Sequence, residues 1–170
     1  MTNRIAIAAI AAAALGLGAC SREASAPTSA NSSAPATAGG SHEAVSQAGD
    51  ASIRASAVQT STLPPQVAAE YGIPRDDRSV LLLVAVRRGP SGQEAAVPAR
   101  ITATATDLRG RRQAITIREM KTKGPGTEVL LDYIGTVEVS PPDTLRFDLT
   151  VALDGGATTT MQFTRDFYPR

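Results

Sequence analysis

Residues 144–154 carry the pattern that most limits what this chain can fold into, because apolar and polar or small side chains alternate there without interruption. Side chains of a β-strand point to opposite faces in turn, so an alternation of period two predicts a strand with one buried face. Asp154-Gly155-Gly156 is a tight-turn sequence, and 157–164 resumes the alternation. The two segments predict a C-terminal hairpin, whose first strand buries Leu145, Phe147, Leu149, Val151 and Leu153.

The same alternation recurs upstream in three segments, at 97–108, 113–118 and 127–139. Turn sequences that contain glycine separate them, at 109–110 and at 124–126. Each segment keeps a period of two, which indicates a strand and not a helix. The middle of the chain therefore predicts further antiparallel strands joined by short turns.

Two segments complete the set of expected strands. Residues 80–86 are apolar at successive positions, which is typical of a central strand covered on both faces. Residues 52–62 show a weaker alternation and predict the first strand. Pro141 and Pro142 separate two strands, because proline cannot donate to a β-ladder.

The pattern as a whole predicts an all-β protein of about seven strands, spaced as in a sandwich with a turn every 8 to 12 residues. We expect an immunoglobulin-like antiparallel β-sandwich with one short helix between the first two strands, and a small barrel is the second choice. No helical stripe of ten residues lies between the strands, which disfavours a parallel α/β sheet.

The N-terminus predicts export. Residues 1–19 have a basic start at Arg4 and a short run of Ala, Ile and Leu, as in a signal peptide. Leu17-Gly18-Ala19-Cys20 resembles the lipobox of bacterial lipoproteins, in which the cysteine becomes the lipidated N-terminus. That resemblance implies lipidation at Cys20 and a membrane anchor, with an ordinary secreted protein cut after Ala19 as the alternative.

Ser21 follows the lipobox cysteine, and by resemblance to enterobacterial sorting rules serine at this position implies the outer membrane, facing the periplasm of a Gram-negative bacterium. Residues 20–49 are rich in Ala, Ser, Pro, Thr and Gly, so they predict a disordered tether that cannot bury enough apolar surface to order itself. His42 lies in this tether and we expect no metal there. Residues 50–170 remain for one folded domain.

Composition excludes several functions. The chain has 17 basic and 16 acidic residues, and removing Arg4 with the signal peptide leaves 16 of each sign. Balanced charge argues against a nucleic-acid partner. The domain has no histidine or cysteine, so it lacks the usual base for a Ser or Cys nucleophile and the usual ligands of zinc. We expect no metal and no cofactor.

A carboxylate pair is the remaining route to catalysis, as in glycoside hydrolases. Asp76, Asp77, Asp132 and Asp148 are candidates by residue type alone, because nothing in the sequence brings two of them together. We therefore expect a protein that is not an enzyme, with a carboxylate-dependent hydrolase as a distant alternative.

Residues 63–86, LPPQVAAEYGIPRDDRSVLLLVAV, interrupt the strand pattern and carry a family resemblance. They resemble the start of a family of exported bacterial proteins with a domain of unknown function, DUF4426. The C-terminal Phe163, Phe167 and Tyr168 are similar to the family's final pattern, and DTLRFDLTV resembles its penultimate strand. The resemblance implies an exported β-sandwich with no assigned activity.

The same segment predicts a short helix over 66–71, because Pro65 suits a first helical position, Gly72 a C-terminal cap and Pro74 a stop. Two interpretations stay open. The helix caps one end of the sandwich, with Tyr71 in the core; or Tyr71, Arg75 and Arg78 form a lip that binds a partner.

Two functional hypotheses follow. The first is a membrane-anchored periplasmic lipoprotein that acts as a non-catalytic binding or interaction module, with another envelope protein as its partner. The alternative is a carrier that holds a small apolar ligand between the sheets, where the small inward residues Ala99, Ala103 and Ala105 would leave space.

Overall fold

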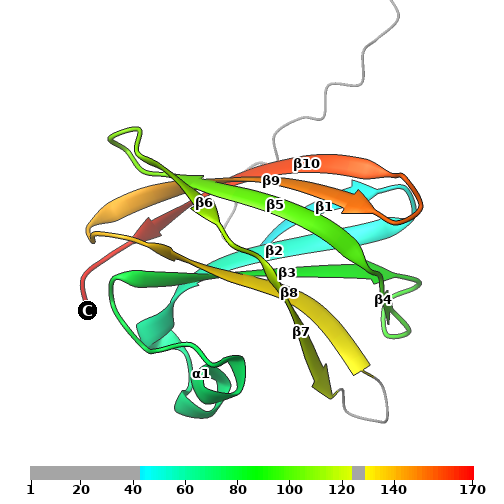
Figure 1. Cartoon of the computed structure of the whole chain (residues 1–170), viewed down its shortest axis with the longest axis horizontal. Helices are drawn as coiled ribbons and strands as arrows, with labels where there is room; N and C mark the ends of the chain where they lie inside the picture. Colours follow the sequence, from blue (N-terminus) through cyan, green and yellow to red (C-terminus); the bar gives the residue numbers. More distant parts are fainter. Residues whose placement is uncertain (1–42, 124–128) are drawn as a thin grey trace, which may run out of the picture. The chain divides into compact units, whose positions relative to one another are not determined.

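The computed structural model describes residues 43–123 and 129–170, which form two antiparallel sheets packed face to face (Figure 1). The six-stranded sheet has the order β1-β2-β3-β8-β7, with β4 paired to β3, and the four-stranded sheet has the order β10-β9-β5-β6. The strands are β1 (Glu43–Ala48), β2 (Ala51–Gln59), β3 (Ser79–Arg88), β4 (Ala95–Ala96), β5 (Ala99–Thr106), β6 (Arg112–Ile115), β7 (Arg118–Lys123), β8 (Val129–Glu138), β9 (Asp143–Leu153) and β10 (Thr158–Phe167).

The predicted all-β sandwich is confirmed. The C-terminal hairpin pairs β9 with β10 through a turn in which Gly156 has a φ of 87°. Its inward residues are buried as the alternation predicts, and Phe147 stacks on Phe163 with ring centroids 5.0 Å apart. Pro141 and Pro142 separate β8 from β9.

The predicted start of the domain at residue 50 is wrong, because the fold includes β1, Glu43–Ala48. This strand pairs with β2 through a turn at Gly49, whose φ is 60°. A tether of small residues offers little apolar surface, but Ala48 is only 3% exposed and the β-ladder satisfies the backbone. The helix therefore follows the second strand. The predicted signal peptide, Cys20 and the rest of the predicted tether up to residue 42 lie outside the described residues.

The predicted strand over 113–118 is two strands in different sheets. β6 pairs with β5 in the four-stranded sheet, whereas β7 pairs with β8 in the six-stranded sheet. The chain crosses between the sheets directly over Gly135, where an added Cβ would lie 2.6 Å from Ile115 Cγ2 and 2.8 Å from the Thr116 carbonyl oxygen. The absence of a side chain at Gly135 permits this crossing.

The inward faces of both sheets form the main core. Val80, Val84 and Phe147 are fully buried there. The inward alanines Ala103 and Ala105 are 6% and 0% exposed within the same core, so small side chains here accompany close packing of the sheets.

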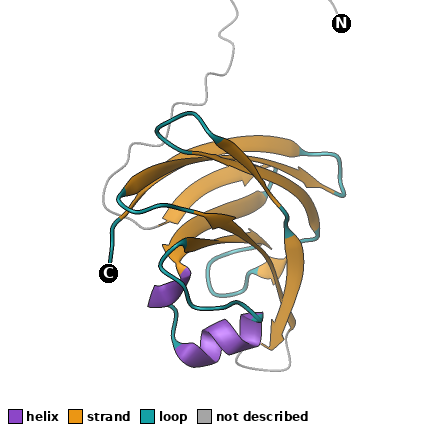
Figure 2. Ribbon diagram, turned by 60° about the vertical axis from the view of Figure 1, so that its left-hand side comes forward, coloured by secondary structure: helices purple, strands orange, loops and turns teal. Residues whose placement is uncertain are grey.

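A second, smaller core covers the outer face of the six-stranded sheet (Figure 2). A 3-10 turn, η1 (Thr60–Thr62), and the helix α1 (Pro65–Tyr71) connect β2 to β3 and lie against this face. Ile73, Leu81 and Ile134 are its buried members, which confirms that β3 is covered on both sides. Among the described residues, no helix has the length and apolar character needed to cross a bilayer.

Candidate functional site

The helix α1 ends as the sequence predicts. Pro65 is its first residue, and Gly72 adopts a left-handed conformation with φ 62°, which glycine reaches without the steric penalty of a Cβ. The Ile73 N–H donates to the Ala68 carbonyl over 2.9 Å and turns the chain back towards the sheet. This ending places Tyr71 and Ile73 on the side that faces the sheet.

Tyr71 helps to dock the helix on the sheet. Its ring packs at the edge of the second core, and burial raises the pKa of its hydroxyl, with smaller contributions from Asp132 and Glu70. The Arg118 guanidinium on β7 donates a hydrogen bond to the Tyr71 carbonyl at the C-terminal end of α1. These contacts tie α1 to β7.

Arg75 contacts the neighbouring backbone. Its guanidinium donates to the Ser61 carbonyl over 2.6 Å. Beside it, the Thr60 hydroxyl donates to the Asp76 carbonyl over 3.0 Å and accepts from the Asp76 N–H over 2.9 Å. The loop before β3 is therefore fastened to η1.

Arg78 lies elsewhere, in the wall of an open groove of about 740 Å³. The groove lies where the loop before β3, the strand β6 and the end of β8 meet. Its lining consists of Asp76, Arg78, Ser79, Gln113, Ala114 and residues 136–140. Of the predicted lip residues, only Arg78 lines this groove, so the structure does not bring Tyr71, Arg75 and Arg78 together in one site.

Two groove residues carry opposite charges that are not used inside the described fold. Arg78 contributes its backbone, since its N–H donates to Asp76 Oδ1 and its carbonyl accepts from Val139. Within residues 43–123 and 129–170, neither the Arg78 guanidinium nor the Glu138 carboxylate has a hydrogen-bond or ion-pair partner. Both groups are thus available to a ligand.

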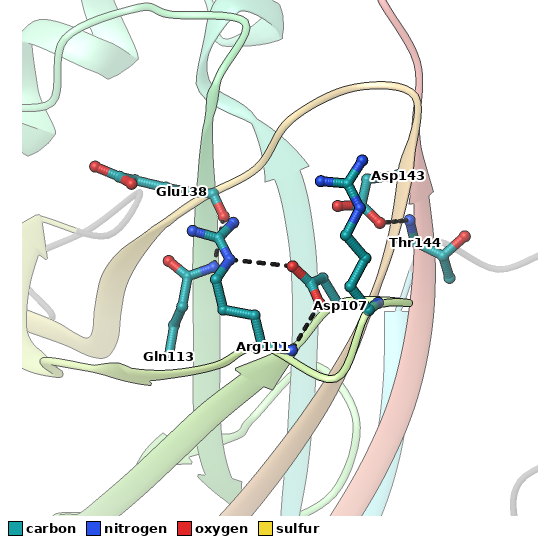
Figure 3. Close-up of polar contacts among 7 residues, drawn as sticks. Asp107, Arg111, Gln113, Glu138, Asp143 and Thr144 are labelled. Carbon is teal, nitrogen blue, oxygen red and sulfur yellow. Dashed lines mark hydrogen bonds and ion pairs between the residues drawn. The ribbon is translucent and has the colours of Figure 1, made fainter.

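The floor of the groove is a stretch of β8 that its neighbour β7 leaves uncovered. The β7–β8 ladder ends where Arg118 pairs with Ile134, whereas the β3–β8 ladder continues to Glu138. Beyond Ile134, the side-chain amide of Gln113 reaches across from β6 and donates to the Glu138 carbonyl over 2.9 Å (Figure 3). A side chain therefore substitutes for a neighbouring strand at this edge.

The turn beside the groove is held by Asp107, whose side chain is 3% exposed (Figure 3). Its carboxylate accepts from the Arg109 and Arg111 N–H groups over 3.0 and 2.8 Å, and from Arg111 Nε over 3.1 Å. Burial by itself would raise the pKa of Asp107, but the hydrogen bonds from Arg111 and Arg109 outweigh it and hold the pKa below its ordinary value of 3.8. The turn that leads into β6 is therefore well fixed.

The carboxylates proposed for a hydrolase lie in three different parts of the fold, and only Asp76 and Asp77 are neighbours. Asp132 pairs with Arg87 across the outer face of the six-stranded sheet. Asp148 is on β9 in the other sheet, in contact with Arg146 and Gln162. Asp76 and Asp77 lie in the loop before β3. The described part of the chain has no group of three or more His, Cys, Asp or Glu side chains suited to a metal ion.

Sequence reasoning missed Gln113, Glu138 and Asp107. Asp107 carries a usable signal, because aspartate at the end of a strand with glycine three residues later is typical of a turn. Gln113 and Glu138 carry none, since their contact depends on the crossing of the chain between the sheets.

Comparison with known proteins decides the family. The sequence model of one protein family, the domain of unknown function DUF4426, matches residues 45–170. The chain belongs to the DUF4426 family. The predicted resemblance to this family is thus confirmed over residues 45–170. Comparison with curated proteins finds no match.

A solved structure supports the fold. The crystal structure of a DUF4426 family protein from Pseudomonas aeruginosa PAO1 superposes with a TM-score of 0.58 and 24% sequence identity. The alignment covers 76% of this chain and 97% of that chain. At this identity the likeness establishes the fold that the two proteins share.

Proposed function

We propose that this DUF4426 protein is a lipid-anchored module of the bacterial envelope that binds another protein and catalyses no reaction. The lipobox-like Leu17-Gly18-Ala19-Cys20 supports an anchor on Cys20, and Ser21 supports delivery to the outer membrane, facing the periplasm. A lipid chain holds the domain at the membrane, where it meets envelope proteins.

The observation that carries the proposal is a groove lined by two charged residues whose charged groups have no partner among the described residues. Arg78 and Glu138 line one open groove of about 740 Å³ without pairing with each other. Charged groups that a fold leaves unpaired at a concave surface give a partner specificity through complementary charges. The fixed turn at Asp107 keeps the wall in place, so little order has to be gained on binding.

The candidate carboxylates support a binding rather than a catalytic role. Asp132 and Asp148 are each engaged by an arginine, and they belong to different sheets. A glycosidase pair needs two carboxyl groups within roughly 5 to 10 Å across one substrate. The proposal therefore assigns these groups to the stability of the fold.

Photo-crosslinking in intact cells tests the proposal. A photoreactive residue replaces Ala114, which is exposed in the wall of the groove. The control replaces Thr150, which is exposed on the outer face of the same sheet. We expect a reproducible protein adduct from position 114 and none from position 150. Equal adducts from both positions, or no protein adduct from position 114, would contradict the proposal.

A further inference from the structure

We propose that the uncovered edge of β8 receives an extended peptide segment of the partner as an added β-strand. This inference rests on the proposed function and names the mode of recognition and the chemistry of the partner. The segment carries an acidic side chain for Arg78 and a basic one for Glu138.

The hydrogen bonds around β8 show which backbone groups face the groove. The Val139 N–H donates to the Arg78 carbonyl over 2.8 Å, on the β3 side of the strand. The Glu138 carbonyl instead accepts from Gln113, on the opposite side. Because backbone groups of successive residues point to opposite neighbours, those of Thr136 share the direction of those of Glu138. Both residues therefore present an N–H and a carbonyl to the open edge.

This edge is a short stretch of β-ladder, residues 135–138 of β8. On the β7 side, pairing ends at Ile134, while β8 itself continues to Glu138 in its ladder with β3. An extended peptide adds to such an edge through main-chain hydrogen bonds, and its side chains provide specificity. A glycan does not repeat backbone donors and acceptors at the spacing of a β-ladder, and a folded partner does so only where it exposes an edge strand of its own.

Gln113 covers part of this edge in the free protein and so limits its pairing with other strands. Unpaired strand edges invite uncontrolled association, and proteins cover them with side chains or loops. Gln113 covers only the Glu138 carbonyl, so a strand that displaces one amide gains the remaining groups of Thr136 and Glu138. At the far side of the sandwich, the edge strands β1 and β10 lie beside each other, with Ser46 Oγ 3.5 Å from Thr159 Oγ1.

The charges specify the segment further. Arg78 and Glu138 both line this groove, and within residues 43–123 and 129–170 neither charged group has a hydrogen-bond or ion-pair partner. A segment with only basic residues meets Arg78 unfavourably, and one with only acidic residues meets Glu138 unfavourably. Complementary charges of both signs therefore favour a mixed sequence.

The probe is a displayed library of linear peptides of about a dozen residues, long enough to cross the edge as one strand. It is selected on the mature chain with Cys20→Ser, which prevents lipidation. We expect selected peptides to carry both charges and to lose about tenfold in affinity with Thr136→Pro, which removes an N–H that faces the groove. Thr136→Val keeps that N–H and should bind nearly as the parent chain does.

Amide hydrogen exchange provides a second readout that does not depend on how well Thr136→Pro folds. We expect the peptide to slow exchange at Thr136 and Glu138 in the parent chain. Three results would overturn strand addition. The selected peptides could bind Thr136→Pro as tightly as Thr136→Val, or slow amide exchange only in other strands. The library could also yield no binder.

The crosslink at position 114 separates this inference from the proposed function. If Thr136→Pro leaves the adduct unchanged, the protein binds a partner at the groove but not by strand addition. If the adduct itself is absent, the proposed function fails as well.

Discussion

Asp107 shows how a single buried carboxylate can fix the wall of a binding groove. Three hydrogen bonds, from Arg109 and from Arg111, hold it in the turn that leads into β6. The Gln113 amide that covers Glu138 lies two residues beyond this turn. The position of the groove wall therefore depends on the ionised form of one side chain.

The lowered pKa of Asp107 gives a pH-dependent prediction. Because its folded-state pKa is below the ordinary 3.8, ionised Asp107 stabilises the fold above that value, and this contribution is lost as pH falls through the folded pKa. We expect Asp107→Asn to lower the urea midpoint at neutral pH, with the gap to the parent chain closing below 3.8.

The control for Asp107 is Asp154→Asn in the exposed β9–β10 turn. Urea titrations of the three proteins across acidic pH provide the measurement. A difference between Asp107→Asn and the parent that persists unchanged in strong acid would show that the carboxylate charge is not its source.

Gly135 supports a second prediction at the scale of one residue. A methyl group there would lie 2.6 Å from Ile115 and 2.8 Å from the Thr116 carbonyl. We expect Gly135→Ala to lower the free energy of unfolding by about 1–3 kcal/mol or more, because the crossing chain must shift. At Gly155 an added Cβ meets no atom within 4 Å, so Gly155→Ala should have little effect. Equal effects of the two changes would contradict the close approach.

At the scale of elements, the sequence predicts most of the strands and the helix but not their ends or partners. Alternation predicts β5, β8, β9 and β10 because one face of each is buried and the other is wet. It fails at β1, where backbone pairing and small residues replace apolar surface. It also fails at the junction of β6 and β7, because alternation does not indicate a change of sheet.

The candidate site was less predictable than the fold. The proposed lip grouped Tyr71, Arg75 and Arg78 because they are close in sequence. The second core takes up the ring of Tyr71, Arg75 bonds to Ser61, and Arg78 faces the groove. The other groove residues, such as Gln113 on β6 and Glu138 on β8, come close to Arg78 only in the tertiary fold.

The helix α1 supports a prediction of its own. Tyr71 is half-buried against the second core, so we expect Tyr71→Ala to lower the free energy of unfolding by about 2 kcal/mol, roughly half the cost of truncating a fully buried aromatic residue. Crosslinking from position 114 should persist. Tyr168 is 64% exposed, and Tyr168→Ala is the matched control. A stable Tyr71→Ala protein without the crosslink would place the binding surface on α1 instead.

At the scale of the whole molecule, we propose that a lipid anchor at the N-terminus holds the folded domain at the membrane. We expect palmitate label to enter the wild-type protein and not Cys20→Ser, because the lipobox-like sequence predicts acylation at Cys20. Globomycin should cause the precursor to accumulate. The prediction is contradicted if the wild-type protein takes up no label and separates from the membrane in the same fraction as Cys20→Ser.

The groove beside β8 is the surface that we propose for binding a partner. Amide hydrogen exchange of the mature chain, with and without the protein captured by crosslinking at position 114, tests it most directly. We expect slower exchange at Thr136 and Glu138 and in the loop that contains Arg78. This binding surface is contradicted if exchange slows only in α1 or on the outer face of the four-stranded sheet, while exchange at the β8 edge is unchanged.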